Sequence, residues 1–325
     1  MRHFWRWPVA LAALLLAVAQ GGAQGSVQDW PTRTVRIIIP LGAGGGGDIF
    51  TRLLADEFRK RFGQAFVVEN RTGGGLNIGT RACAESPPDG YTICVISSEP
   101  IVYNQFLFKS LPFNPEKDFE PITNLFVNTL AFVAHSSLKV KTIPELVALA
   151  KAKPGTLSFG TFSFPLAVYM DKLNKQNGAD IVRVPFRSGN EVVNAVMSGS
   201  SPVAILGLAN MIPQIQSGHI TALAVNANKR SPLFPDVPTL KEAMGEEYPM
   251  TWFGLFAPAG TPRPIINLLA AEVARITSDP TFMQKNYIDR AVEYAVNTPE
   301  EFAKFIVRDR ARAAQVAKES GQQPQ

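Results

Sequence analysis

Short apolar runs rich in β-branched residues alternate with segments of helical periodicity along the first hundred residues. The run 35–39 is typical of a strand buried on both faces, and the apolar positions of 49–58 recur at helical spacing. A second strand is predicted over 65–70, a helix then continues to Ser86, and a third strand is predicted over 91–97. This β-α-β-α-β order predicts a parallel sheet with right-handed crossovers.

The alternation resumes after a loop that proline and charged residues predict over 111–120. Strands are predicted over 130–134, 157–161, 181–186, 203–208 and 222–225, with helices over 143–153, 165–175 and 191–197. The last part is predicted to contain a strand, 252–257, and two packing helices, 264–278 and 299–319. We therefore expect two α/β lobes, the first completed by the C-terminal region, with a ligand cleft between them. The expected domains are 27–125 plus 249–325, and 126–248.

The first residues have the pattern of a secretory signal peptide over 1–23. Arg2 and Arg6 precede an apolar run, 9–19, and small residues follow it. The run is too short to span a bilayer as a stable helix, although a retained membrane anchor is the alternative. We therefore expect export of the mature chain.

Composition and charge narrow the possible functions. The 325 residues are 46% apolar and 18% charged, as in ordinary globular proteins. The formal net charge is +5, and removal of Arg2 and Arg6 lowers it to +3. Because no basic stripe is interleaved with aromatic residues, no nucleic-acid partner is expected. The histidines are not spaced as metal ligands are, so no metal is expected. No cofactor is expected either.

Cys83 and Cys94 leave two interpretations open. In an oxidising compartment they could form a disulfide, since Cys83 lies in a predicted helix and Cys94 in the strand that follows. The interpretation that we prefer is that both are small, buried apolar residues.

Two glycine-rich turns follow predicted strands of the first unit. One is 42–47, before a helix that should begin near Asp48, and the other is 72–79. Both turns should lie at the carboxyl edge of the sheet, where open α/β sheets bind ligands. The amides and dipole of a helix N-terminus favour an anion or carboxylate, while a tight turn without a ligand is the alternative. Asp48 is expected to be both the helix N-cap and a lip of the cleft.

The pattern Gly42-x-Gly44-x-x-Gly47 also matches the dinucleotide-binding fingerprint. Glu69 ends the next strand about 20 residues further on, where a ribose-binding acid is expected. An NAD-dependent oxidoreductase is therefore the alternative from another function class. Against it, an exported protein has poor access to NAD, and the fingerprint does not explain the second glycine turn. Because the sequence also lacks a Gly-x-Ser-x-Gly elbow, no catalytic residue is assigned.

Several sequence blocks, in order, resemble the Bug-type solute receptors of tripartite tricarboxylate transporters across almost the whole mature chain. These blocks are 30–33, 41–48, 67–71, 75–79, 88–92, 118–119, 229–232, 236–239 and 252–262. The resemblance implies a monomeric periplasmic receptor with the two-domain, type II-like Venus-flytrap fold. Such receptors bind a small carboxylated molecule and deliver it to a membrane permease. A sensor subunit of the same fold is a further alternative.

The resemblance also implies which loops hold the ligand. Backbone groups and ordered water of the first loop would hold a carboxylate, and serine hydroxyls can donate to it. The residues carried over are Gly42, Ala43, Gly44, Gly45, Asp48, Gly74, Gly75, Asn77, Ser97 and Ser98 in domain 1, and Thr161, Phe162, Ser163, Phe164 and Arg187 in domain 2. Arg187 could hold a second carboxylate or be a solvated loop residue.

The domain 2 loop 161–165 departs from the family pattern. It lacks the usual glycine-rich run, and Ala167 stands where a histidine is common. Glu99 occupies a region in which the family favours small residues. These departures predict a more apolar wall, so we expect one carboxylate in domain 1 and an apolar or aromatic body against Phe162 and Phe164. Inward packing of both phenylalanines is the alternative.

Overall fold

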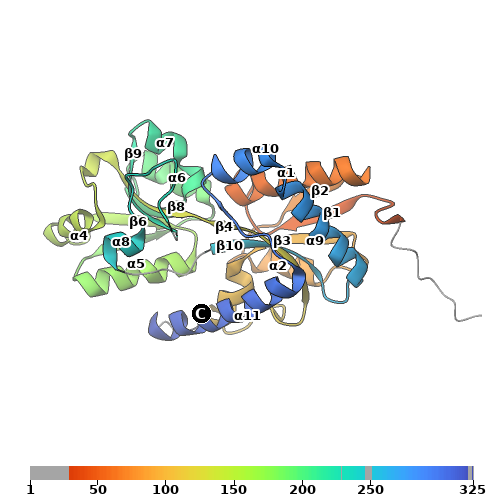
Figure 1. Cartoon of the computed structure of the whole chain (residues 1–325). Coiled ribbons are helices and arrows are strands. Elements are labelled where there is room, and N and C mark those ends of the chain that lie inside the picture. Colours follow the sequence, from red (N-terminus) through yellow and green to blue (C-terminus); the bar gives the residue numbers. More distant parts are fainter. Residues whose placement is uncertain (1–28, 228, 246–250, 321–323, 325) are drawn as a thin grey trace, which may run out of the picture.

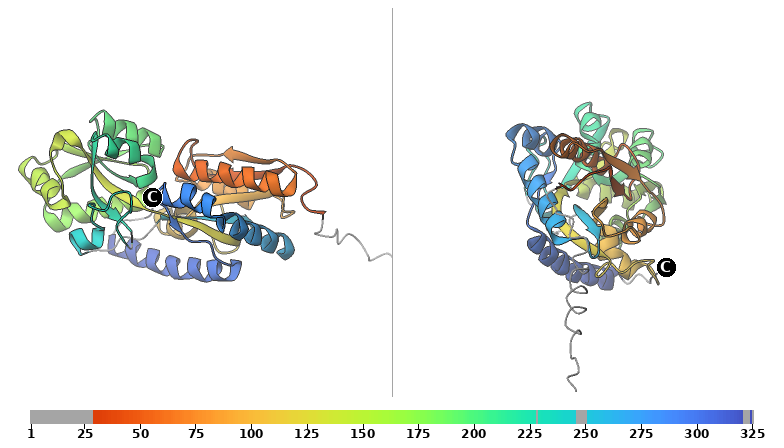
Figure 2. Two further views of the ribbon diagram at one scale, coloured as in Figure 1. Left: turned by 45° about the horizontal axis from the view of Figure 1, so that its top comes forward. Right: turned by 90° about the vertical axis from the view of Figure 1, so that its right-hand side faces the viewer.

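A computed structural model describes residues 29–227, 229–245, 251–320 and 324. Two lobes lie side by side along the length of the molecule, each built on one sheet with helices on both faces (Figure 1). The turned views separate the same two lobes (Figure 2). The predicted signal peptide, 1–23, lies outside the described residues. Within the described ranges, no helix is both long and apolar enough to cross a membrane.

The first lobe contains a six-stranded sheet with the order β11-β4-β10-β3-β1-β2. Its strands are β1 (Val35–Ile39), β2 (Phe66–Asn70), β3 (Thr92–Ser97), β4 (Phe119–Asn128), β10 (Thr251–Pro258) and β11 (Glu293–Tyr294). Its helices are α1 (Gly46–Phe62), α2 (Asn77–Ala84), α3 (Asn104–Leu107), α9 (Arg263–Thr277), α10 (Pro280–Met283) and α11 (Pro299–Ser320), with the π-helices η2 (Glu99–Tyr103) and η5 (Gln284–Ile288). Since β1 pairs in parallel with both β2 and β3, the predicted β-α-β-α-β unit is confirmed.

The apolar run of β1 is buried on both faces of this sheet. Val35, Ile37 and Ile39 belong to a core cluster that α1 and α9 complete, whereas Ile38 packs in a cluster with residues of η2 and α11. All four side chains are fully buried. Burial of successive residues on opposite faces is what a strand requires when helices cover both sides.

The second lobe contains a five-stranded sheet with the order β7-β6-β8-β5-β9. Its strands are β5 (Leu130–His135), β6 (Leu157–Thr161), β7 (Ile181–Pro185), β8 (Val203–Gly207) and β9 (Ile220–Asn226). Its helices are α4 (Ile143–Ala152), α5 (Phe164–Asn177), α6 (Gly189–Met197), α7 (Ile212–Gln216) and α8 (Leu240–Met244), with the short 3-10 helices η3 (Ser136–Leu138) and η4 (Leu208–Asn210). Helices α4, α5 and α8 share one core cluster and α6 lies in another, so this sheet is also a central layer.

The chain passes from the first sheet to the second at Thr129, between β4 and β5, and is back in the first sheet at Thr251, where β10 begins. The proposed domain division, 27–125 plus 249–325 and 126–248, stays a prediction. The prediction of a loop over 111–120 is wrong at the C-terminal end of that range, because Phe119 begins the ten-residue strand β4. That strand pairs with β10, which is distant in the sequence, so its extended form depends on tertiary contacts.

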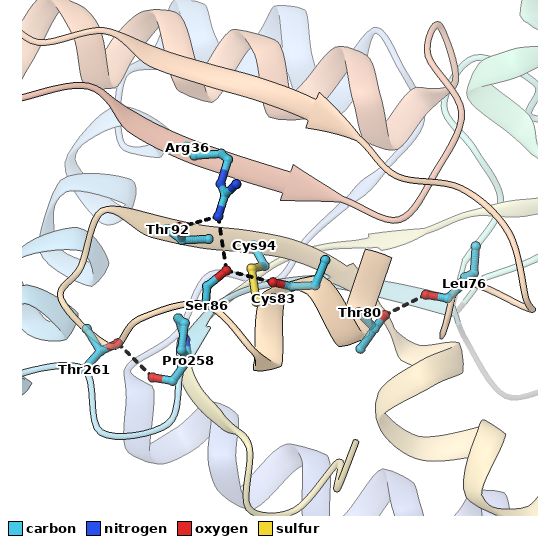
Figure 3. Close-up of a disulfide and its surroundings, with 10 residues drawn as sticks. Arg36, Leu76, Thr80, Cys83, Ser86, Thr92, Cys94, Pro258 and Thr261 are labelled. Carbon is cyan, nitrogen blue, oxygen red and sulfur yellow. Dashed lines mark hydrogen bonds between the residues drawn. A yellow bond between two sulfur atoms is a disulfide. The ribbon is translucent and has the colours of Figure 1, made fainter. Parts of the chain in front are cut away.

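The two cysteines form a disulfide, so the preferred interpretation of two unbonded apolar residues is wrong (Figure 3). Cys83 and Cys94 are fully buried, and their Cα atoms are 6.3 Å apart because α2 packs on β3. Nearby, Arg36 Nη2 donates hydrogen bonds to Ser86 Oγ (3.2 Å) and Thr92 Oγ1 (3.1 Å). Helix α2, which begins beside the second glycine turn, is thus held to the sheet at its far end.

Candidate ligand-binding site

A cavity of about 360 Å³ lies between the two lobes. Its first-lobe wall comes from the loops that follow β1, β2 and β3, and its second-lobe wall from the loops that follow β6, β7 and β8. Within each lobe these three strands run parallel, so the loops gather at one edge of each sheet. Ligand pockets of roughly 300–1,000 Å³ are typical of small-molecule sites. The cavity therefore suits a small organic molecule.

The first glycine loop is held by Asp48, although not as predicted. Helix α1 begins at Gly46 with Gly45 as its N-cap, so Asp48 lies in the first turn and the N-cap prediction is wrong. The Asp48 carboxylate is 2% exposed and accepts hydrogen bonds from the Gly44 amide (2.8 Å), Asn70 Nδ2 (2.8 Å) and Arg52 Nε (3.0 Å). Asp48 thus holds the loop through Gly44, and no side chain caps the first turn of α1.

The charge of Asp48 is balanced inside the first lobe. Burial alone would raise the pKa of Asp48, but hydrogen bonds from Arg52, Gly44 and Asn70 outweigh burial and lower it below its ordinary value. Asp48 therefore lines the cavity as an ionised carboxylate that is paired with Arg52. The amides of Gly47 and Asp48 have no hydrogen-bond acceptor within the described chain, and both residues line the cavity. The N-terminus of α1 can therefore donate to an anion there.

The second glycine turn brings backbone to the cavity at the end of β2. Gly73, Gly74 and Gly75 have φ angles of 114°, 58° and 62°, which side chains disfavour. Asn104 Nδ2 donates to the Gly75 carbonyl (2.8 Å) and to Asn77 Oδ1 (2.7 Å). Asn77 thus helps to hold the turn and is not part of the cavity wall.

The second-lobe wall combines aromatic surface with a fixed turn. Phe162 is half-buried, lines the cavity and also packs against the core cluster around α6. Ser163 follows it, and the Ser163 amide donates to Thr161 Oγ1 (3.0 Å), which holds the turn. Phe164 begins α5, but its side chain lies outside the described part, so its predicted place in the cleft stays a prediction. Phe186 adds a second aromatic side chain to the wall.

Hydrogen bonds join the lobes around the cavity. The Gly46 amide donates to Asn210 Oδ1 (3.2 Å), and Asn190 Nδ2 donates to the Ala43 carbonyl (3.3 Å). A third contact links Ser163 Oγ, which donates, to a carboxylate oxygen of Glu99. The first-lobe loops are thus in direct contact with the loops after β6, β7 and β8.

Charged side chains on the wall come from both sides of the cavity. Arg187 is exposed and lines the cavity, and its side chain makes no ion pair with any described residue. Arg290 also lines it, and its Nε is buried without a hydrogen-bond partner among the described residues. Glu99, unlike Asp48, forms no ion pair with any described residue. Burial raises its pKa to about 7, and the Ser163 hydrogen bond opposes this rise.

Most of the predicted ligand residues lie on the cavity wall. Those that line it are Gly42, Ala43, Gly45, Asp48, Gly74, Gly75, Ser97, Phe162, Ser163 and Arg187. Gly44, Asn77, Ser98 and Thr161 lie next to lining residues in the chain but do not line it. Direct ligand contact stays a prediction for every residue in both groups.

The sequence analysis did not find several polar residues of the wall. These are Asn128, Asn190, Asn210, Asn286 and Arg290. Asn190 and Asn210 each follow a predicted strand, so their positions were a usable signal. The others come from elements that only the tertiary structure brings to the cavity. Glu69, the acid expected to bind a ribose, instead contacts Arg71 Nε (2.6 Å) and is not part of the wall.

Two α/β lobes around a small-molecule cavity lined by strand-end loops define a two-lobed solute-binding protein. The family model for the tripartite tricarboxylate transporter family receptor matches residues 50–322. The chain belongs to this receptor family, and the resemblance to Bug-type receptors is confirmed. Receptors of this family are periplasmic.

Similar proteins cover nearly the whole chain. BugT of Bordetella pertussis is 29% identical, over 96% of this chain and 97% of its own. A Rhodopseudomonas palustris protein solved with adipate is 27% identical, with a TM-score of 0.86 over 91% of this chain and 100% of its own. MatC from the same organism, solved with bound malate, is 28% identical, with a TM-score of 0.80 over 89% of this chain and 100% of its own.

Proposed function

We propose that this protein is a periplasmic receptor that binds a small carboxylated molecule between its lobes and delivers it to a membrane permease of the tripartite tricarboxylate type. The observation that carries the proposal is the position of the first glycine loop and the α1 N-terminus on the wall of an interlobe cavity. Adipate and malate, found with two similar proteins, are both carboxylates, which supports the same ligand class here.

In the proposed complex, the first lobe holds the carboxylate. The amides of Gly47 and Asp48 lie at the positive end of the α1 dipole, and helix N–H groups point toward the N-terminus, where anions are favoured. Ser97 adds a buried hydroxyl, with no described partner, to the same wall. An apolar or aromatic body then lies against Phe162 and Phe186 of the second lobe.

A thermal-shift screen, followed by calorimetry, tests this proposal. The mature protein is unfolded, dialysed and refolded to remove any bound ligand, then mixed with citrate, malate, adipate, benzoate, phenylacetate or NAD. A ligand that binds only the folded protein raises the melting temperature by mass action. We expect shifts with the aromatic monocarboxylates and none with NAD.

Two results would contradict the proposal at different levels. Tight binding of citrate without measurable binding of benzoate or phenylacetate would overturn the aromatic binding mode and leave the receptor class. Binding of NAD, with no carboxylate bound, would overturn the assignment of the protein as a carboxylate receptor. Delivery to a permease is tested separately: deletion of the gene should abolish uptake of the identified ligand, and the intact chain should restore it.

A further inference from the structure

Glu99 is a buried carboxyl group on the wall of the ligand cavity. It is the first residue of η2, directly beyond β3, and is only 9% exposed. One of its oxygens accepts the hydrogen bond from Ser163 Oγ, and the other has no described partner. Arg187 and Arg290 lie on the same wall, but in the described part of the chain neither forms an ion pair with Glu99.

A carboxyl group in this position responds to the charge of whatever enters the cavity. Burial of an unpaired anion is costly, which is why burial raises the pKa of Glu99 to about 7. A ligand cation would favour the ionised form and pair with it. A second ligand carboxylate would be repelled by that form and would bind only if a proton were taken up.

We propose that Glu99 selects ligands that carry a positively charged hydrogen-bond donor, such as an ammonium group, in addition to their carboxylate, and that it disfavours dicarboxylates. The inference rests on the proposed function, because it takes the first glycine loop as the carboxylate site. The ligand class is then an amino-substituted monocarboxylate with an apolar body. Ser97 Oγ, which is buried, offers a further acceptor on the same wall.

The topology places the two charged subsites close together. The glycine loop follows β1 and Glu99 follows β3, and these strands are parallel neighbours with Ile38 opposite Cys94. Neighbouring strands are about 4.8 Å apart. A ligand that fits a cavity of about 360 Å³ can therefore contact both strand ends at once.

Arg187 and Arg290 share the cavity wall with Glu99, and other titratable groups lie on η2 and on the helix packed against it. Tyr103 is in η2 itself, and Asp309 and Arg312 belong to α11, which packs on η2. Burial and the charge of Asp309 raise the pKa of Tyr103 far above neutrality, so Tyr103 does not titrate near pH 7. Glu99 lines the cavity, whereas Tyr103 and Asp309 do not, so Glu99 is the group whose ionisation should govern binding in that range.

Matched ligands separate this inference from simple carboxylate binding. Phenylalanine, 3-phenylpropanoate and benzylmalonate share one body and differ only in bearing an ammonium, a hydrogen or a second carboxylate. Leucine, 4-methylpentanoate and isobutylmalonate form the aliphatic series. Calorimetry on the wild-type protein should give at least tenfold tighter binding of the amino member than of the unsubstituted member, with the dicarboxylate weakest.

Two variants test the role of the side chain. Glu99→Gln keeps the shape and one acceptor but removes the charge, so it should abolish the preference for the amino member. Ser163→Ala removes the hydrogen bond from Ser163 to Glu99 but keeps the Glu99 carboxyl group, so it should retain the preference for the amino member. Equal loss of the preference in both variants would mean that Glu99 acts through the lobe contact, and would overturn the inference.

The pH dependence is a readout that needs no variant. If Glu99 must ionise to pair with the ligand, the wild-type affinity for the amino member should fall about tenfold for each pH unit below 7. The affinity should level off above pH 7, up to the pH at which the ammonium group of the ligand itself loses its proton. Glu99→Gln should remove the fall below pH 7. A flat profile in the wild-type protein would contradict the inference.

The failure of this inference differs from the failure of the proposed function. If the unsubstituted acid or the dicarboxylate binds the wild-type protein as tightly as the amino member, the Glu99 inference is overturned and the carboxylate receptor stands. If no carboxylate of either series or of the earlier screen binds at millimolar concentration, the proposed function is overturned, and this inference with it.

Discussion

Replacing Asp48 by asparagine should destabilise the loop that the proposed function assigns to the ligand carboxylate. The carboxylate accepts hydrogen bonds from the Gly44 amide, Asn70 Nδ2 and Arg52 Nε. Asparagine has one acceptor oxygen, and its NH₂ group would face donors that now point at the second carboxylate oxygen. The variant therefore loses at least one buried hydrogen bond and the ion pair with Arg52.

The expected cost follows from these contacts. A hydrogen bond to a charged group contributes about 1.5–3 kcal/mol, and a donor left without an acceptor adds to the loss. The Arg52 side chain is 49% exposed, so solvent screening limits the contribution of its ion pair with Asp48 to less than about 1 kcal/mol. We expect Asp48→Asn to lower the free energy of unfolding by about 2–4 kcal/mol, and to weaken carboxylate binding because the glycine loop loses its anchor.

Urea unfolding at pH 7 measures the effect against a matched control. Asp56→Asn makes the same change in the same helix, but Asp56 is 66% exposed and lies 4.0 Å from Arg59, so it should cost less than about 0.5 kcal/mol. Because the folded-state pKa of Asp48 is lowered, its contribution is complete above the ordinary value near 4 and is lost as the pH falls through the lowered pKa. The difference between wild type and Asp48→Asn should thus shrink in acid. Equal stability of the two variants at pH 7 would refute the reasoning.

Three further changes test other parts of the structure. Phe162→Ala removes an aromatic side chain from the cavity wall. It should lower the affinity for aromatic acids, measured by calorimetry, by about 10–100-fold, since burying such a group contributes about 1.5–3 kcal/mol. An unchanged affinity would mean that the ligand does not contact Phe162. Reduction of the Cys83–Cys94 disulfide should cost about 2–3 kcal/mol in urea unfolding, whereas the double alanine variant should not respond to reductant. Asp309→Asn should be neutral or stabilising at pH 7, because burial raises the pKa of Asp309 and its anion is disfavoured, while an amide oxygen can still accept from Trp252 Nε1. This advantage should disappear as the pH falls and Asp309 becomes protonated, and a clear loss of stability at pH 7 would contradict it.

The local pattern of the chain predicted the elements whose signals are themselves local. The run Val35–Ile39 and the helix after the glycine loop agree with the prediction. The start of α4 has an equally local cause, since Thr142 Oγ1 accepts the Glu145 amide hydrogen bond (3.2 Å). These features depend on residues within a turn or two of each other, or on a side-chain period that one segment shows by itself.

Placing the candidate site required the fold as well as the pattern. The glycine turns were found from sequence because glycines after a strand mark a sheet edge. Asp48 was predicted one turn too early in the helix, because one of the donors to its carboxylate is Asn70, which reaches it only from the neighbouring strand. Arg290 had no signal in sequence, since its place on the wall depends on the C-terminal segment crossing to the cavity.

The sequence by itself therefore determined the two α/β units, the family and the loops at the sheet edges. The tertiary structure decided that Phe119–Asn128 is a strand, that Cys83 meets Cys94, and that Ser163 of one lobe contacts Glu99 of the other. The physical reason is the range of the interactions. Helix periodicity and turn chemistry are set by neighbours along the chain, whereas sheet pairing, a disulfide and the charge balance of a cavity are set by groups that only folding brings together.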